Sequence, residues 1–393
     1  MHRLRRPIGA QPDRRQPNLR TARIGTVVQS RHAHTEAGNE SMKIAMMGAG
    51  GVGGFYGARL QQAGHEVTFI ARGAHAAAMR TGGLRVQSAL GDLHLPQVSV
   101  ATDPREVGPV DLVVMAVKLW DTEAAAEAIK PMIGAHTVVV SLQNGVDKDE
   151  TLATVVGRDH VLGSVTYILA NLSEPGIVVH SGRLQRVWIG ELDGGVSDRV
   201  ERVVAAFVAS GIEAAGSTEI RRATWEKFVF LAANSAVTAV TRQTVGAVRT
   251  HPATRALLAD AMREVVALAR AEGVAITEDF VEERLRFVDT LPDGGRASMA
   301  QDLLRGGRLE LDWLSGAVVR RAERLGLASP VHRALYAALV LYKDGAPPRN
   351  RCQANLRTSA GDRPPIRGFN VSRHEIVVSP FTETFAPRER ASS

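Results

Sequence analysis

Hydrophobic residues along the chain gather in short unbroken runs that alternate with longer stretches of helical spacing. From residue 42 onward, an apolar run at 43–47 leads into a glycine-rich turn, a helical stretch at 55–62 and a second apolar run at 66–71. Short apolar runs bounded by glycine are typical of buried strands, and the spacing between them is typical of a helix. This segment therefore predicts a strand–helix–strand unit with parallel strands.

Two further apolar runs, at 111–117 and 137–141, contain almost no polar residues. Runs of this kind are typical of strands in a parallel sheet that helices cover on both faces. An alanine-rich helical stretch at 122–129 separates them. The alternation predicts an α/β protein with a Rossmann-type doubly wound parallel sheet.

The pattern changes after residue 160. Short β-like runs between 161 and 191 lie around Pro175-Gly176 and Ser181-Gly182, and they predict short strands added to the same domain. Beyond Thr218 the residues follow helical spacing that is interrupted by Gly or Pro. Helices are expected at 225–238, 251–272, 279–289 and 309–325.

These patterns predict a dinucleotide-binding domain at 42–217 and a mostly α-helical substrate domain at 218–344. Two basic tails flank them. Residues 1–41 hold eight Arg against three acidic residues (+5), and residues 345–393 hold eight against four (+4). Since the formal net charge of the chain is +7, residues 42–344 carry −2. The excess positive charge lies in the tails alone, so we expect no nucleic-acid partner. Both tails lack helical periodicity and are predicted to be disordered. The first tail is interpreted either as a non-native extension before Met42 or as an Arg-rich transit peptide.

The composition favours a protein of the cytoplasm. Cys352 is the only cysteine, which excludes a disulfide framework and is typical of a reducing compartment. Every apolar run is shorter than the roughly 18 to 20 residues that cross a bilayer, so no membrane association is expected. His32 and His34 have no further ligands at metal spacing, and no metal is predicted. The sequence leaves a homodimer open.

The turn after the first strand has the GxGxxG spacing of a dinucleotide site. The motif is weak by itself in a chain with 37 Gly, but here a strand precedes it and a helix follows. Gly48 permits the tight turn, Gly50 lets the backbone approach a pyrophosphate, and Gly53 lets the helix pack on the strand. The predicted cofactor-binding residues are Gly48, Ala49, Gly50, Gly51, Val52 and Gly53.

The end of the second strand indicates which dinucleotide is used. An acidic residue there binds the 2′-hydroxyl of NAD, whereas an Arg accommodates the 2′-phosphate of NADP. This strand ends in Arg72 with no acidic residue beside it, so NADP is expected. Lys118, at the end of the next long strand, is a second candidate phosphate partner, and the alternative for Arg72 is a solvated side chain.

Several short motifs follow one another in a characteristic order. Besides the glycine turn, they are Gly64-His65-Glu66-Val67 before Arg72, Val117-Lys118-Leu119-Trp120, Leu142-Gln143-Asn144-Gly145-Val146, Trp225-Glu226-Lys227, Ser298-Met299-Ala300-Gln301-Asp302 and Glu310-Leu311-Asp312. In these motifs the chain resembles the ketopantoate reductase family (2-dehydropantoate 2-reductases) over about residues 42–344. The resemblance implies a Rossmann domain before a helical domain. It also implies NADPH-dependent reduction of 2-dehydropantoate to pantoate, in pantothenate and coenzyme A biosynthesis.

The resemblance further implies that Lys227 is the general acid and that Glu310 binds and orients substrate. It implies too that Asn144 and Ser298 complete the substrate site, and that Asn144 also binds the cofactor. Hydride arriving at C2 of a 2-oxo acid creates an alkoxide, so a cation with a transferable proton is needed nearby. A lysine ammonium supplies both at neutral pH without any pKa shift. Glu310 is expected to hydrogen-bond a substrate hydroxyl and Lys227. Without the resemblance, the two charged residues would be interpreted as solvated helix-face charges, Ser298 as an N-cap and Asn144 as a turn residue.

The chain departs from the family where substrate-binding asparagines are usual. Leu231 and Ser235 stand four and eight residues after Lys227, and Val245 precedes Gly246. Asn234 is one residue, or about 100° of helix rotation, away from the second of these positions and is not equivalent to it. Loss of polar contacts weakens discrimination for a hydroxylated substrate. The alternatives are therefore a reductase of another 2-oxo acid or carbonyl compound, and a non-catalytic dinucleotide-binding sensor.

Overall fold

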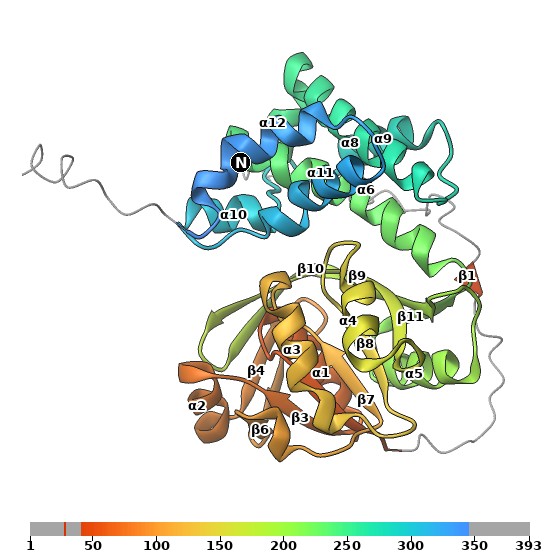
Figure 1. Ribbon diagram of the computed structural model, residues 1–393. Coiled ribbons are helices and arrows are strands. Elements are labelled where there is room, and N and C mark those ends of the chain that lie inside the picture. The colour runs from red at the N-terminus through yellow and green to blue at the C-terminus, as the bar shows by residue number, and fades with distance from the viewer. Residues whose placement is uncertain (1–26, 29–40, 346–393) are drawn as a thin grey trace, which may run out of the picture. The chain divides into compact units, whose positions relative to one another are not determined.

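The computed structural model (Figure 1) describes residues 27–28 and 41–345, and the remaining parts of both predicted tails lie outside the described residues. Within the N-terminal tail, Val27–Val28 (β1) pairs antiparallel with Ser217 and Gly216, a strand that the sequence analysis did not expect. Residues 41–345 belong to one compact unit.

The parallel strands follow the doubly wound order, with the first strand of the fold at the centre. The order β6-β3-β2-β7-β8-β9 places the glycine-bearing strand β2 between β3 and β7. All neighbouring pairs along this path are parallel. The strands are β2 (Lys43–Met47), β3 (Glu66–Ile70), β6 (Ser99–Ala101), β7 (Leu112–Met115), β8 (Val138–Ser141) and β9 (Val161–Glu174). The predicted fold class is confirmed.

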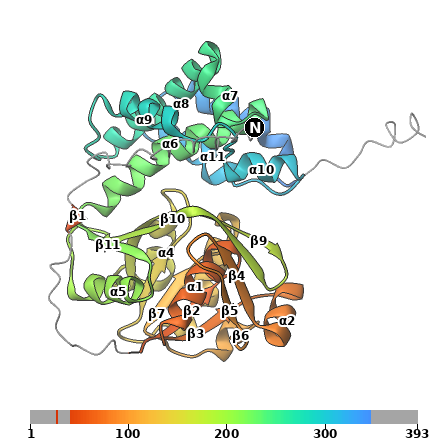
Figure 2. The ribbon, with the colours of Figure 1, turned by 180° about the vertical axis from the view of Figure 1, so that it is seen from behind.

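Helices cover both faces of this sheet, as Figures 1 and 2 show from opposite sides. Phe55 of α1 and Phe207 of α5 are fully buried against one face, and Ala126 of α3 and Leu152 of α4 are fully buried against the other. Covering both faces explains why these strands are apolar throughout instead of alternating. The helices are α1 (Gly51–Gln62), α2 (Gly73–Gly82), α3 (Thr122–Ala128), α4 (Lys148–Val156) and α5 (Asp198–Ala209).

The segment 161–191 adds strands to this sheet, as expected, but it forms one long antiparallel hairpin in place of the short strands that its pattern predicts. Pro175-Gly176 is the turn of this hairpin, with Gly176 at φ +82°. Ser181-Gly182 lies inside β10 at an irregularity of register and does not end the strand. The further strands are β10 (Ile177–Glu191), β11 (Glu213–Ser217), β4 (Leu84–Ser88) and β5 (Leu93–Leu95).

The last strand of the sheet ends at Ser217, and helices follow from Ile220. The longest helix, α6, packs against α8, α10 and α12 and buries side chains around most of its circumference, as a helix inside a core must. The predicted helix at 309–325 begins later, because residues 311–313 form a 3₁₀ turn, η5. The helices are α6 (Ile220–Thr241), α7 (Val245–Thr250), α8 (Pro252–Ala271), α9 (Phe280–Thr290), α10 (Ser298–Leu304), α11 (Ser315–Arg324) and α12 (Pro330–Leu339). The domain boundary at 217/218 itself stays a prediction.

Candidate active site

The glycine turn between β2 and α1 has the geometry that the sequence motif requires. Gly48 has φ +99°, and a Cβ atom there would lie 2.9 Å from the backbone N of Val117. At Gly53 a Cβ atom would lie 2.0 Å from the carbonyl O of Gly48, so only glycine lets the helix approach the strand. A Cβ atom at Gly50 would meet nothing within 4 Å, and no side chain caps the α1 N-terminus there. The turn thus presents uncapped helix N–H groups to open space, which is what a pyrophosphate needs.

Two other predicted residues of this turn serve the packing around it. A Cβ atom at Gly51 would lie 2.3 Å from the carbonyl O of Ala170, so this glycine lets β9 pass close to the turn. The carbonyl O of Ala49 lies 2.7 Å from Nε2 of His75, whose Nδ1 accepts a hydrogen bond from the Gly176 N–H at 3.0 Å. His75 thus joins the turn to the β9–β10 hairpin. This role of His75 was not predicted, because no local pattern in the sequence reveals such a contact.

The two candidate phosphate ligands lie at the same edge of the sheet. Arg72 lies two residues after the end of β3. Its side chain is 78% exposed, and its Nη2 lies 3.6 Å from Oδ2 of Asp121. Lys118 follows β7, and its Nζ lies 3.3 Å from Oδ2 of Asp302 in α10. Both ion pairs are exposed enough to be weak. A bound phosphate could therefore recruit either cation.

Lys227, on α6, meets Asn144, which follows β8. The Nζ of Lys227 donates a 2.8 Å hydrogen bond to Oδ1 of Asn144 and a 2.6 Å hydrogen bond to the carbonyl O of Thr166 in β9. It also lies 5.4 Å from the centre of the Tyr167 ring. Since an ammonium has three N–H donors, one donor is left for a further acceptor. The structure therefore brings together two of the predicted site residues.

The pKa of Lys227 is lowered to about 7, chiefly by burial. The positive charge of Lys148 contributes to this lowering, while the carboxylate of Glu310 opposes both effects. An ordinary lysine pKa was expected, and this expectation was wrong, because the burial of Lys227 between β9 and residues 142–147 (the Asn144 segment) is not visible in the local pattern. A pKa near neutrality suits a group that must release a proton during catalysis.

The other two predicted site residues lie differently from what was expected. Glu310 is buried, and its Oε1 accepts a 3.1 Å hydrogen bond from the backbone N–H of Leu119, so it acts on Lys227 through charge and not through the expected hydrogen bond. Ser298 is the first residue of α10, whose N-cap is Ala297, so Ser298 is not the capping residue. Within the described part of the chain, no hydrogen bond links Ser298 to Lys227 or Asn144.

One face of α6 carries the half-buried side chains Lys227, Leu231 and Asn234. Asn234 comes seven residues after Lys227, about 20° short of two full turns, so the two side chains leave the helix in nearly the same direction. Ser235 and Val245 are buried, so they have joined the core. Among the described residues, Oδ1 of Asn234 and Oγ of Ser235 are both buried without a hydrogen-bond partner, but only Asn234 leaves the helix on the side of Lys227. Asn234, and not Ser235, therefore continues the Lys227 face.

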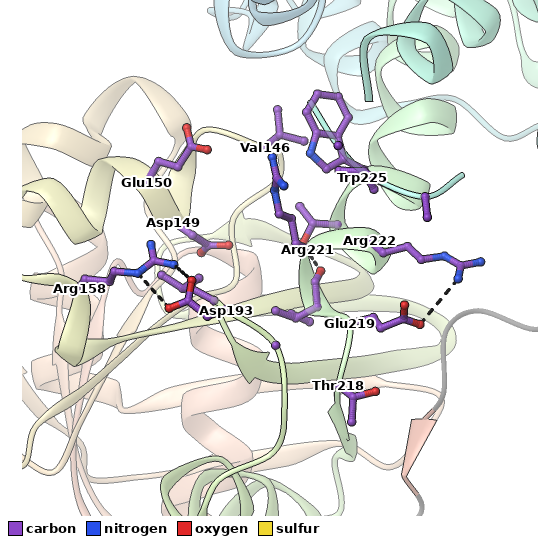
Figure 3. A pocket seen from close by; sticks show the side chains of 17 residues that line it. Val146, Asp149, Glu150, Arg158, Asp193, Thr218, Glu219, Arg221, Arg222 and Trp225 are labelled. Atoms are coloured by element: carbon purple, nitrogen blue, oxygen red, sulfur yellow. Dashed lines mark hydrogen bonds and ion pairs between the residues drawn. The ribbon is translucent and has the colours of Figure 1, made fainter. Parts of the chain in front are cut away.

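Two cavities lie beside this helix. The smaller, of about 10 Å³, is lined by Asn144, Lys148, Lys227 and Leu231, among others. The larger, of about 620 Å³, lies along the first turns of α6 (Figure 3). Its arginines are largely neutralised, since Arg158 pairs with Asp193 and Arg222 with Glu219. Thr224 lines both cavities.

Residues 27–28 and 41–345 contain neither a membrane-spanning helix nor a metal site. None of their helices is both long and apolar enough to span a membrane. No cluster of three or more His, Cys, Asp or Glu residues is arranged to hold a metal ion in that part of the chain.

Known proteins match the chain along almost all of its described length. Residues 44–194 match the family model of ketopantoate reductase PanE/ApbA, and residues 219–343 match the model of its C-terminal domain. A 2-dehydropantoate 2-reductase of Halobacterium salinarum is 38% identical over 296 residues, which cover 75% of this chain and 96% of that protein. An uncharacterized oxidoreductase of Bacillus subtilis, YkpB, is 30% identical over 302 residues, covering 77% and 99%.

Solved structures of ketopantoate reductases have the same fold as this chain. The crystal structure of a PanE/ApbA family ketopantoate reductase from Ralstonia eutropha has a TM-score of 0.71 at 37% identity and covers 77% of this chain and 98% of that one. A D-mandelate dehydrogenase reaches the same TM-score at 22% identity, with the same coverage of 77% and 98%, and is similar in fold alone. The chain belongs to the ketopantoate reductase family of dinucleotide-binding oxidoreductases.

Proposed function

We propose that this protein uses NADPH to reduce a 2-oxo acid to a 2-hydroxy acid, and that its substrate is 2-dehydropantoate, which yields pantoate for pantothenate and coenzyme A biosynthesis. The observation that carries the proposal is the half-buried Lys227 ammonium, held by Asn144 with one N–H donor to spare. Asn144 follows β8, and the glycine turn follows β2, so both stand at the carboxyl edge of one parallel sheet. Ligands of doubly wound folds bind at that edge. The family match supports the reaction class.

The residues of the chain account for the proton half of this reaction. When bound, the nicotinamide supplies the hydride that adds to C2. The third N–H of Lys227 would donate to the carbonyl oxygen at C2. As the C=O double bond becomes a single bond, that oxygen gains negative charge and takes the proton, leaving Lys227 a neutral amine that solvent reprotonates. Asn144 and Thr166 hold the amine in place throughout.

Asn234 is the residue through which we expect the substrate's hydroxyl to be recognised. The buried Oδ1 of Asn234 accepts a hydrogen bond when a hydroxylated substrate binds and stays unpaired with a substrate that lacks the hydroxyl. Wild type should therefore prefer 2-dehydropantoate over 3,3-dimethyl-2-oxobutanoate, which has the same carbon skeleton without the hydroxyl. Asn234→Ala should reduce this preference in kcat/KM by about 10-fold or more. Ser235→Ala, which changes the neighbouring buried residue, should leave the preference as in wild type.

The same pair of substrates tests the alternative of a less hydroxylated 2-oxo acid. The apolar Leu231, which lines the small cavity beside Lys227, is the observation that favours this alternative. A wild-type enzyme that reduces the compound without the hydroxyl at least as well would establish it. NADPH binding without turnover of any 2-oxo acid would instead favour the non-catalytic sensor.

Cofactor preference should depend on Arg72. Only NADPH offers its guanidinium a charged partner that can take two hydrogen bonds, and its pair with Asp121 is exposed and easily exchanged. Arg72→Ala should therefore raise the Michaelis constant for NADPH far more than that for NADH, measured by cofactor oxidation with a saturating 2-oxo acid. Equal effects on both cofactors would show that Arg72 does not meet the 2′-phosphate.

A further inference from the structure

Lys148 is a buried lysine that the proposed reaction has not yet used. It is the first residue of α4, and its side chain is 2% exposed. Its Nζ lies 2.7 Å from Oδ1 of Asp149, whose side chain is 13% exposed. Burying an ammonium is costly even when it has a counter-ion. A buried cation of this kind therefore calls for an explanation.

The position of Lys148 explains why its charge is buried. Lys148 and Lys227 both line the same cavity of about 10 Å³, together with Asn144 and Leu231. Two positive charges that line so small a cavity, one on a side chain that is 2% exposed and the other on a half-buried one, repel each other more strongly than they would in water. The repulsion is relieved whenever one of them gives up its proton.

The other groups around Lys227 offset the repulsion by Lys148 only in part. From β9, it meets the carbonyl O of Thr166 and the neutral ring of Tyr167, and from the segment after β8 the neutral amide of Asn144. Glu310 is the carboxylate that favours the charged form of Lys227, and its hydrogen bond goes to Leu119. Lys148 is the cation that disfavours it.

We propose that Lys148 is a positioning residue for proton transfer: its buried ammonium, held by Asp149 at the wall of the shared cavity, drives Lys227 to give its proton to the substrate. The inference rests on the proposed role of Lys227 as proton donor. A neighbouring cation is a known means of activating a lysine. The lowered pKa of Lys227, to which burial contributes most and Lys148 next, agrees with this arrangement.

The pH profile of the full-length protein tests the proposal. Reduction needs protonated Lys227, so wild-type kcat/KM for NADPH-dependent reduction of the best 2-oxo acid should fall as pH rises through about 7. Lys148→Met and Lys148→Gln remove the second charge and should move this fall upward by about 1 pH unit. One unit above the wild-type midpoint, either variant should then retain about fivefold more of its own acid-side kcat/KM than wild type does. Lys148→Arg keeps the charge and should restore the wild-type midpoint.

A matched control removes the same charge elsewhere. Lys130, in the 3₁₀ turn Lys130–Met132, is 49% exposed and pairs with Glu127, so Lys130→Met changes the net charge equally at a solvated position. Its midpoint should stay at the wild-type value. NADPH binding, measured by fluorescence, checks that each variant is folded.

The outcomes separate this inference from the function on which it rests. A wild-type profile without any fall near pH 7 would contradict the role of Lys227 itself. A wild-type fall that does not move in a folded Met or Gln variant, or that moves equally in Lys130→Met, would overturn the role of Lys148 alone. If only the Arg variant folds, the pair with Asp149 is structural, and the proposal is again overturned.

Discussion

Replacing Lys227 with alanine should lower the turnover of the best 2-oxo acid by about 10² to 10⁴-fold, the usual contribution of a general acid. The expected loss is large because two effects disappear together. The developing alkoxide loses both its proton source and the nearby positive charge. NADPH binding should change little, since the predicted cofactor ligands lie in the glycine turn and at Arg72. Steady-state rates and cofactor fluorescence measure the two quantities separately.

Lys227→Arg is the matched control for this experiment. Arginine keeps a positive charge and several donors, but it does not release a proton in the neutral range. Turnover should therefore stay low, and the fall in rate through about pH 7 should disappear. Turnover of the alanine variant within a few-fold of wild type would show that Lys227 is not the proton donor.

The direction of the pH effect follows from which form of Lys227 each reaction consumes. Reduction consumes the ammonium, so its rate should fall as pH rises through about 7. Oxidation of the 2-hydroxy acid consumes the neutral amine, so its rate should rise over the same range. A lysine of ordinary pKa would leave the reduction rate unchanged there, and the oxidation rate would keep rising up to about pH 10 instead of levelling off above about pH 7.

Local features of the fold could be predicted because each has a local physical cause. The residues of β7 are all apolar because the strand is buried on both faces of the sheet. The glycine turn follows from close approaches that only glycine allows, at Gly48 and Gly53. The length of the hairpin strands was not predicted, because a local cause was not enough there. Gly176 and Gly182 both have positive φ, yet only Gly176 ends a strand. Whether such a glycine is a turn or an irregularity depends on pairing with a distant strand.

The active site could be predicted only as far as motifs identify its members. The family motifs include Lys227 and Asn144, and the structure joins them with a hydrogen bond. Neither the lowered pKa of Lys227 nor the buried charge of Lys148 follows from a motif, because both depend on how segments far apart in the sequence pack around one cavity. Helix geometry alone predicts which residues share a face of α6 with Lys227. A residue seven positions further along the helix lies almost above it, and in this chain that residue is Asn234.

Arg321 holds the Asn144 segment to the helices, and its loss should strongly destabilise the protein. Its side chain, on α11, is 7% exposed. Nε lies 2.6 Å from Oδ1 of Asp147, and Nη1 lies 2.7 Å from Oε1 of Glu272, at the end of α8. A third bond, of 2.6 Å, joins Nη2 to Oε2 of Glu150, which is exposed and should add little. The buried guanidinium thus bridges carboxylates from the sheet side and from the helices.

Arg321→Met keeps much of the side chain's length but leaves the carboxylates of Asp147 and Glu272 without their main cation. Glu272 is only 10% exposed, so it cannot recover full hydration. Removing one partner of a buried ion pair typically costs about 3 to 5 kcal/mol. The thermal and urea unfolding midpoints should fall accordingly. Because Asp147 lies three residues after Asn144, turnover should also decrease at temperatures where the variant is still folded.

The neighbouring arginine gives the comparison that decides between a buried network and general charge loss. Arg320 is 54% exposed, and its Nη2 lies 3.7 Å from Oδ2 of the same Asp147. Arg320→Met removes one positive charge from the same helix, yet an exposed pair contributes at most about 1 kcal/mol. Its unfolding midpoint should therefore stay close to that of wild type. Equal midpoints for the two variants would show that Arg321 contributes no more than a surface charge, and that packing around α6 holds the Asn144 segment without it.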